Sequence, residues 1–284
     1  MTVADALNDR PVTSLDLSRY VVTSADVAVE VTIDKMSSAG YSCALVTDAR
    51  RLVGIFTQRD VLMKVVAEPD AAGRATGDLM TAAPQTVSSG QSVADALAIM
   101  NEHNVRSVPV LDHGGAVLGN VSVYVLMQVI AGLLADRSLA TPTEVSAHHG
   151  MEFVDLTGLN TRLPVTVHET DSLEAAVHQM KSRAIGSVFV VDDRGSLVGV
   201  VTEFDLQVKG AWREADLSTR SVSDLMTRDP VALAARSSIA EAIQKMASNG
   251  FAHVPLLGES GRPRGVASFR DIAGYFETTV AVLE

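Results

Sequence analysis

The feature that most constrains the fold of this chain is an internal repeat that occurs four times. Equivalent glycines mark the copies at Gly54, Gly119, Gly199 and Gly265. Neighbouring glycines within each half are 65 or 66 residues apart, and the two halves are offset by 145 or 146 residues. Self-similarity of this kind indicates a fold assembled from repeated small units. The nesting predicts a pair of units that occurs twice in the 284 residues.

Each copy contains the same order of apolar patterns. The first pattern places apolar residues at i, i+4 and i+7 and ends on Met36, Met100, Met180 or Met246. This spacing is typical of one buried helix face. A β-type run begins eight residues after each methionine, and a polar turn, a second short strand and a final helical segment follow. The predicted unit is therefore strand, helix, strand, strand, helix, which makes the chain α/β (α+β) in class.

The repeat also predicts where the units begin and end. We expect units at 1–72, 73–136, 151–216 and 217–284, separated in the middle by a linker at 137–150 that contains Pro142 and several Ser and Thr residues. In the first unit, residues 11–13 and 20–23 both have the pattern of the opening strand.

Composition excludes several classes of protein. A formal net charge of −11 argues against a broad nucleic-acid surface. The single cysteine, Cys43, cannot form an internal disulfide and lies in an apolar run, which predicts a buried thiol. The most apolar stretch, 121–135, is shorter than a membrane span, and residues 1–10 lack the apolar core of a secretory signal. We therefore expect a cytoplasmic protein with no membrane span.

Three short motifs give the chain a family resemblance. M-T-x-x-P occurs at 80–84 and 226–230, and V-P-V-L or V-P-L-L occurs at 108–111 and 254–257. G-h-x-T/S-x-x-D (h, apolar) closes the first, third and fourth copies. The chain resembles the cystathionine β-synthase (CBS) domain family in four copies. This resemblance implies two paired (Bateman) modules with clefts for adenosine-containing ligands. AMP, ADP or ATP is expected, with NAD or S-adenosylmethionine as alternatives.

The same resemblance implies a regulatory protein rather than an enzyme. Its output would pass to an unknown protein partner, and its modules would form a homodimer or a disc. A ligand-free structural or oligomerisation scaffold is the alternative. An enzyme such as a nucleotide hydrolase would need a base, nucleophile or metal beside the phosphates. The adjacent His148 and His149 make a poor chelate, so no metal site is predicted.

The closing motif has both a structural and a functional interpretation. Thr57 can cap a helix whose third residue, Asp60, reaches back to the cap amide, which stabilises the helix start by about 1 kcal/mol. The free amides at such a helix start also suit a phosphate, and the carboxylate matches the hydroxyl pair of a ribose. Neighbouring arginines would supply positive charge. The predicted ligand-binding residues are Gly54, Thr57, Arg59, Asp60, Gly199, Thr202, Asp205, Gly265, Ser268, Arg270 and Asp271.

The copies are not equal in this motif. The second retains Ser122 but has Val125 in place of the acid, and Asn120 stands where an apolar residue belongs, which predicts an empty or degenerate site. Phe189 could crowd a base in the third site. Two further cationic candidates, Arg106 and His253, lie near the strands that enter the predicted clefts. The expected adenine walls are Leu45, Val108, Phe189 and Val254.

Overall fold

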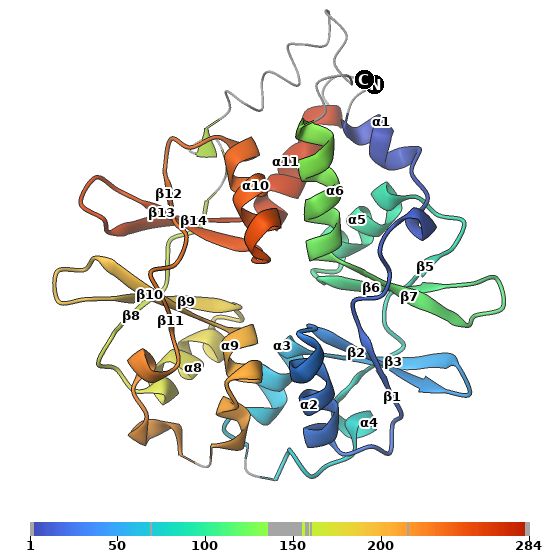
Figure 1. Cartoon of the computed structure of the whole chain (residues 1–284), viewed down its shortest axis with the longest axis horizontal. Coiled ribbons are helices and arrows are strands. Elements are labelled where there is room, and N and C mark those ends of the chain that lie inside the picture. Colours follow the sequence, from blue (N-terminus) through green and yellow to red (C-terminus); the bar gives the residue numbers. More distant parts are fainter. Residues whose placement is uncertain are drawn as a thin grey trace, which may run out of the picture.

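The computed structural model describes residues 3–68, 70–135, 155–156, 159, 161–214 and 216–281, with side chains as far as Tyr275. The predicted linker at 137–150, including His148 and His149, lies outside the described residues. Four units of similar size surround a common centre (Figure 1). Each has a small sheet and helices, so the prediction of an α/β (α+β) chain of four repeated units is confirmed.

Every unit has the predicted order of elements. Unit 1 contains β1 (Val21–Thr23), α2 (Val29–Ala39), β2 (Cys43–Asp48), β3 (Arg51–Thr57), α3 (Gln58–Asp60) and its π-helical continuation η2 (Val61–Val65). Unit 2 contains β5 (Val87–Ser88), α5 (Val93–Glu102), β6 (Ser107–Leu111), β7 (Val117–Ser122) and α6 (Val123–Ala135). Unit 3 contains β8 (Thr166–His168), α8 (Leu173–Ser182), β9 (Ser187–Val191), β10 (Leu197–Thr202) and α9 (Glu203–Val208). Unit 4 contains β12 (Leu233–Ala234), α10 (Ile239–Asn249), β13 (His253–Leu257), β14 (Pro263–Ser268) and α11 (Phe269–Ala281).

Short elements connect these units. They are α1 (Val3–Asn8), η1 (Val12–Ser14), α4 (Thr76–Leu79), β4 (Thr81–Ala82), η5 (Ala211–Arg213), η6 (Leu217–Thr219), η7 (Val222–Asp224) and β11 (Thr227–Arg228). None of the helices that the structure describes is long and apolar enough to cross a membrane.

The two candidates for the first strand are resolved by packing. Residues 20–23 supply β1, which pairs in parallel with β2. Residues 11–13 do not form the strand of unit 1, so that alternative is wrong. Val12 is fully buried in the core of units 2 and 4, and its amide donates to the carbonyl of Gln91 at 3.0 Å. The burial of Val12 on the neighbouring unit explains why this segment leaves unit 1.

Each sheet combines parallel and antiparallel pairings: one of each in units 2 and 4, and one parallel and two antiparallel in units 1 and 3. In unit 1 the order is β1-β2-β3-β4, and in unit 3 it is β11-β10-β9-β8. The edge strands β4 and β11 come from the M-T-x-x-P segments at 80–84 and 226–230, so each motif completes the sheet of the preceding unit. The sheets of units 2 and 4 have the orders β5-β6-β7 and β12-β13-β14.

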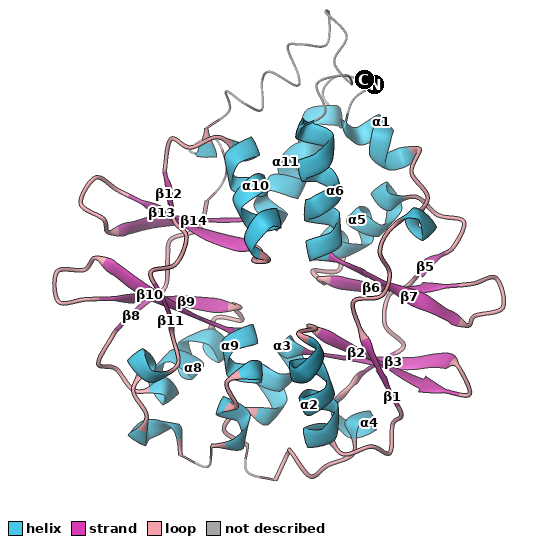
Figure 2. Ribbon diagram, viewed as in Figure 1, coloured by secondary structure: helices cyan, strands magenta, loops and turns pink. Residues whose placement is uncertain are grey.

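The two main cores join units from different halves of the chain. Helices of unit 1 pack against unit 3, where α2 and α3 contact α9, and helices of unit 2 pack against unit 4, where α6 contacts α10. The four predicted methionines are buried in these cores. Figure 2 shows the helices gathered in two groups, with the strands between them at either side. The halves are thus held together by apolar burial.

Units within one half meet through their sheets. Cys43, Leu45 and Ile55 form a small buried cluster that contacts Val117 of unit 2, and burial raises the pKa of the Cys43 thiol to about 12. The prediction of a buried thiol at Cys43 is therefore confirmed. In the other half, the amide of Leu197 donates to the carbonyl of Gly261 at 3.2 Å, joining units 3 and 4.

We predict that Gly199→Ala destabilises the fold by roughly 1–3 kcal/mol, because an added methyl overpacks a filled core. A Cβ at this position would lie 2.3 Å from Sδ of the buried Met226. Gly132→Ala in α6 is the control, since its Cβ would meet no atom within 4 Å. Gly132→Ala should raise the free energy of unfolding by about 0.5–1 kcal/mol, because alanine has the higher helix propensity. Urea unfolding measures both, and equal effects would contradict the assigned contact.

Candidate functional site

The closing motifs form helix caps in three units. In unit 1, Oδ2 of Asp60 accepts from the amide of Thr57 at 2.8 Å, and the amide of Asp60 donates to Thr57 Oγ1 at 3.4 Å. The same reciprocal bonds join Thr202 with Asp205 and Ser268 with Asp271. In unit 2, Ser122 accepts only a long bond of 3.4 Å from the amide of Val125. The predicted caps are therefore present, and the second copy lacks the reciprocal carboxylate.

The motif acids Asp60, Asp205 and Asp271 differ in what pairs with Oδ1, the carboxylate oxygen that does not make the cap bond. Oδ1 of Asp60 is paired with Lys64 at 2.6 Å, and Oδ1 of Asp205 with Lys209 at 2.7 Å. Both lysines are four residues after the acid, whereas Asp271 is followed at this spacing by Tyr275. Within the described residues, Asp271 is thus the motif acid that has no ion pair with a lysine.

Two cavities lie where the helix starts converge. The first has a volume of about 530 Å³ and is lined by the helix starts of units 1 and 4, including Thr57, Asp60, Ser268 and Asp271. The second, of about 590 Å³, is lined by those of units 2 and 3. Both volumes fall in the range of small-molecule sites. The motifs are therefore grouped in diagonal pairs.

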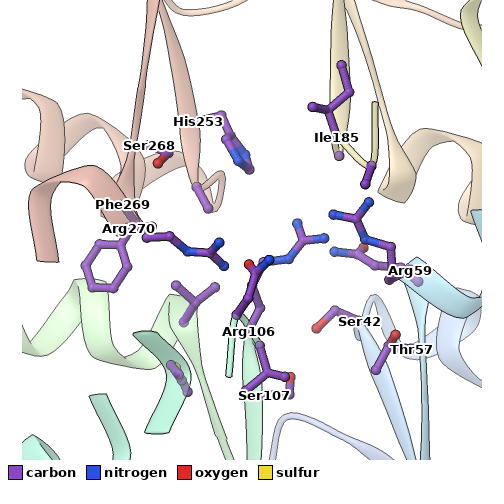
Figure 3. A pocket seen from close by; sticks show the side chains of 18 of the residues that line it. Ser42, Thr57, Arg59, Arg106, Ser107, Ile185, His253, Ser268, Phe269 and Arg270 are labelled. Atoms are coloured by element: carbon purple, nitrogen blue, oxygen red, sulfur yellow. The ribbon is translucent and has the colours of Figure 1, made fainter. Parts of the chain in front are cut away.

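Four arginines line the first cavity, which we call the central arginine cluster. They come from α3, from the residue before β6, from the segment before β8 and from α11, and are Arg59, Arg106, Arg162 and Arg270. Figure 3 shows Arg59, Arg106 and Arg270 pointing toward the same space, with the ring of His253 facing it. Such a cluster offers several forked donors to an anion.

The positive charge of the cluster lowers the pKa of two groups in it, Arg270 and His253. Burial and then the charges of Arg162 and Arg106 lower the pKa of Arg270. Burial, followed by the four arginines of the cluster, lowers the pKa of His253 to about 3. The imidazole is therefore neutral at pH 7, and an anion that entered the cluster would relieve the repulsion among these cations.

One buried acid partly neutralises the cluster. Glu203, the first residue of α9, forms an ion pair with Arg59 at 2.9 Å between Oε1 and Nε, and a second with Arg106. Burial is the largest single influence on Arg106 and lowers its pKa, but the charge of Glu203, the charge of Tyr124 and the hydrogen bond to Glu203 together outweigh it, and the pKa is raised. This acid therefore links unit 3 to units 1 and 2.

The centre of the molecule follows a fourfold pattern of backbone bonds. In each unit the amide of the first residue of the closing helix donates to a backbone carbonyl. The acceptor is the residue just before the strand that precedes the polar turn (β2, β6, β9 or β13). The four pairs are Gln58 with Ser42, Val123 with Arg106, Glu203 with Gly186 and Phe269 with Ala252. Equivalent backbone positions thus carry unlike side chains, and only unit 3 places an acid there and only unit 2 an arginine.

The structure places most of the predicted site residues in the two cavities. Thr57, Arg59, Asp60, Ser268, Arg270 and Asp271 line the first cavity, and Thr202 and Asp205 line the second. Arg106 and His253, also singled out from the sequence, line both.

The motif glycines have a different position. Gly54, Gly199 and Gly265 are not among the residues that line the two cavities. A Cβ on Gly54 would lie 2.2 Å from Sδ of Met80, so this glycine permits close packing of the edge strand. Gly54 and Gly199 are therefore points of close chain approach, and a ligand contact by the three glycines remains a prediction.

Sequence reasoning missed several residues at the centre. Glu203, Arg162, Lys64 and Lys209 were not predicted. An alignment of the closing motifs, TQRD, SVYV, TEFD and SFRD, contains the signal for Glu203, because an acid follows the cap residue only in the third copy. Phe189, expected to crowd a base, is buried where it contributes to the walls of both cavities.

Comparison with known proteins identifies the family. A model of the CBS domain matches residues 12–67, 76–132, 157–208 and 222–278. The chain belongs to the CBS domain family. The predicted unit boundaries themselves remain predictions.

Related CBS proteins share the fold. Protein MJ1225 of Methanocaldococcus jannaschii, proposed as an archaeal homologue of γ-AMPK, has a TM-score of 0.77 at 16% identity, over 94% of this chain and 99% of that one. An uncharacterised protein of Pyrococcus horikoshii has a TM-score of 0.56 at 21% identity, over 82% and 90%. At these identities the likeness shows the fold alone.

Curated relatives are longer than the region they share with this chain. The meiotically up-regulated gene 70 protein of Schizosaccharomyces pombe is 24% identical over 301 residues, which cover 88% of this chain and 41% of that protein. An uncharacterised 17.7 kDa protein of Acidianus ambivalens is 30% identical over 102 residues, 36% of this chain and 60% of that protein. The chain thus matches about half of the length of these relatives.

We predict that His253 makes the CBS fold less stable in mild acid. The unfolded chain takes up a proton near pH 6.5, whereas the folded ring stays neutral to about pH 3. Protons therefore favour the unfolded state, and the stability contributed by the neutral ring falls as pH decreases from 6.5 toward 3. His253→Gln should reduce the loss of stability between pH 7 and pH 5. Denaturant unfolding at both values tests this, and parallel losses in the two proteins would contradict it.

Proposed function

We propose that this protein is a regulatory sensor that binds an adenosine-containing nucleotide in the first cavity, with the phosphates at the central arginine cluster. The observation that supports this most is the convergence of four arginines with two capped helix starts in one cavity of about 530 Å³. A nucleotide is the common cellular ligand with an apolar base, a hydroxylated sugar and a strongly anionic end. The cavity offers complementary groups to all three parts.

The anionic end is served by charge and by backbone amides. Helix α11 begins beside Arg270, and α3 begins beside Arg59. The amides of a first helical turn and the positive end of the helix dipole favour phosphate oxygens. Arginine forks add bidentate hydrogen bonds of the charge-assisted type.

The ribose hydroxyls have one favoured partner. Asp60 is paired with Lys64, so a ribose at unit 1 would compete with an existing ion pair. Asp271 has no lysine at the same spacing, and its Oδ2 alone is committed to the cap at Ser268. We therefore assign the sugar to unit 4. The degenerate motif of unit 2 and the lysine-paired Asp205 make the second cavity the poorer site.

Regulation would follow from the position of the site between the units. A ligand changes a conformational equilibrium only through its different affinity for the two arrangements. A nucleotide in the first cavity would contact units that belong to both halves of the chain, so its binding favours one relative placement of the halves. The signal would pass to a protein partner, and a homodimer or larger disc is the assembly expected for it.

Nucleotide binding also agrees with the family, whose domains in the related proteins are regulatory rather than catalytic. The scaffold alternative has a specific observation in its favour: Asp60 and Asp205 already have internal partners. A scaffold with empty cavities would bind no nucleotide at millimolar concentration. Calorimetry with AMP, ADP, ATP, NAD and S-adenosylmethionine separates the two, and the absence of binding by all five would contradict the proposed sensor.

Arg270→Gln should weaken binding of the preferred nucleotide roughly 10- to 100-fold, because a hydrogen bond to a charged group contributes about 1.5–3 kcal/mol. Arg264→Gln is the matched control, since Arg264 is exposed on the adjacent β14. Calorimetric titration measures both dissociation constants. Equal affinities for the two variants would exclude Arg270 from the phosphate site.

Asp271→Asn should weaken nucleotide binding about tenfold, because the ribose loses a charged acceptor. Binding of inorganic pyrophosphate, which has no ribose, should not be weakened. The change also weakens a helix cap, so Asp95→Asn serves as the control. Asp95 makes the same cap bonds to Ser92, at 2.8 and 2.9 Å, outside the cavities. A parallel loss of pyrophosphate binding would argue against a sugar contact.

A further inference from the structure

The central arginine cluster already contains an anion that belongs to the protein. The side chain of Glu203 is 1% exposed, whereas those of its partners Arg59 and Arg106 are 37% and 26% exposed. The acid is therefore the buried member and the arginines face the cavity. A buried carboxylate is stable only while its cationic partners remain in place.

The fold makes room for this acid at one place. Gly186 is the residue whose carbonyl accepts from the amide of Glu203. A Cβ on Gly186 would lie 3.2 Å from Oε2 of Glu203 and 3.3 Å from Nη1 of Arg106. The equivalent positions in the other units are occupied by Ser42, Arg106 and Ala252, so a glycine occurs only where the acid must reach its partner.

The cluster keeps capacity for a further anion. Nη1 of Arg59 is buried and has no hydrogen-bond partner within the described part of the chain. Arg162 and Arg270 have no ion pair with Glu203 among the described residues, and their charges depress the pKa of His253. Asp60 and Asp271 also act on Arg59 and Arg270, but Asp60 is shared with Lys64, so the carboxylates at the cavity balance only part of the charge of the four arginines.

We propose that Glu203 is an internal competitor for the anionic end of the ligand and sets the charge that a ligand must carry to bind. This inference rests on the proposed nucleotide site. Arg59 and Arg106 can turn to a phosphate only by weakening their contact with Glu203. A diphosphate offers more charge and more acceptors than a monophosphate, so it offsets this loss better. The cationic sulfonium of S-adenosylmethionine gains nothing from the cluster.

Glu203 also connects the two cavities. It lines the second cavity, Arg59 lines the first, and Arg106 lines both. If a phosphate draws these arginines away, the carboxylate of Glu203 is left buried and without its partners at the start of α9. This helix start belongs to the closing motif of unit 3, which lines the second cavity. The site for the ligand's charge and the helix start of unit 3 are thus joined through one side chain.

The test compares the wild-type protein with Glu203→Gln, and uses Glu174→Gln, an exposed acid on α8, as the matched control. Inorganic pyrophosphate, AMP and ADP are the probes in calorimetric titrations. We expect Glu203→Gln to bind pyrophosphate about tenfold more tightly, in keeping with the strength of close charge pairs. Its preference for ADP over AMP should shrink, and Glu174→Gln should match the wild type.

A second measurement covers the effect of the substitution on folding. Without a ligand, Glu203→Gln removes the negative charge that pairs with Arg59 and Arg106, so the melting temperature of the variant should fall. Saturating pyrophosphate should then raise the melting temperature of the variant by more than that of the wild type. Glu203→Asp, which keeps the charge but is shorter by one methylene, should give an intermediate affinity. It serves as the test if Glu203→Gln does not fold.

The outcomes separate this inference from the proposed function. Nucleotide binding by the wild type with unchanged pyrophosphate affinity in both Glu203 variants would overturn the role of Glu203 and leave the sensor intact. Binding of ADP with no change in the ratio of ADP to AMP affinity would likewise overturn it. If neither the wild type nor the variants bound any of the three probes, the role of Glu203 would be overturned, and the proposed sensor would fail as well if ATP, NAD and S-adenosylmethionine also did not bind.

Discussion

The structure depends on the burial of apolar helix faces between units that are distant in the sequence. The stripes ending at Met36 and Met180 share one core, and those ending at Met100 and Met246 share the other. No single unit is large enough to bury such a face by itself. Because unit 1 must pack on unit 3, and unit 2 on unit 4, the two halves are locked in a ring in which the starts of the closing helices meet at the centre.

That meeting point determines the chemistry of the molecule. A helix start presents free amides and partial positive charge, so four of them in one place already favour an anion. The side chains strengthen this preference with arginines from different units, two of which form ion pairs with Glu203. The result is a centre in which a neutral imidazole, a buried carboxylate and several guanidinium groups are balanced against one another.

Divergence among the repeats accounts for the inequality of the two cavities. The backbone at the centre repeats in every unit, as the bonds from Gln58, Val123, Glu203 and Phe269 show. The side chains do not, because each copy needs to satisfy a different set of neighbours. Unit 2 has Val125 at the position of the motif acid and also carries Asn120, whose two amide atoms are buried with no hydrogen-bond partner in the described portion of the structure. Units 1 and 3 have lysines that form ion pairs with their motif acids, whereas Asp271 of unit 4 has no such lysine among the described residues.

The sequence by itself determined the elements, since local forces decide them. The periodicity of the methionine stripes predicted the helices, the alternation of polar turns and β-branched residues predicted the hairpins, and the T-x-x-D spacing predicted the caps at Thr57 and Thr202. Only the tertiary structure decided that the motifs gather in diagonal pairs, and that Glu203 of unit 3 meets Arg59 and Arg106 of units 1 and 2. These contacts join residues about 100 to 145 positions apart, and no local spacing encodes them. Their position follows from which apolar faces are buried together, which is settled by the packing of the whole chain.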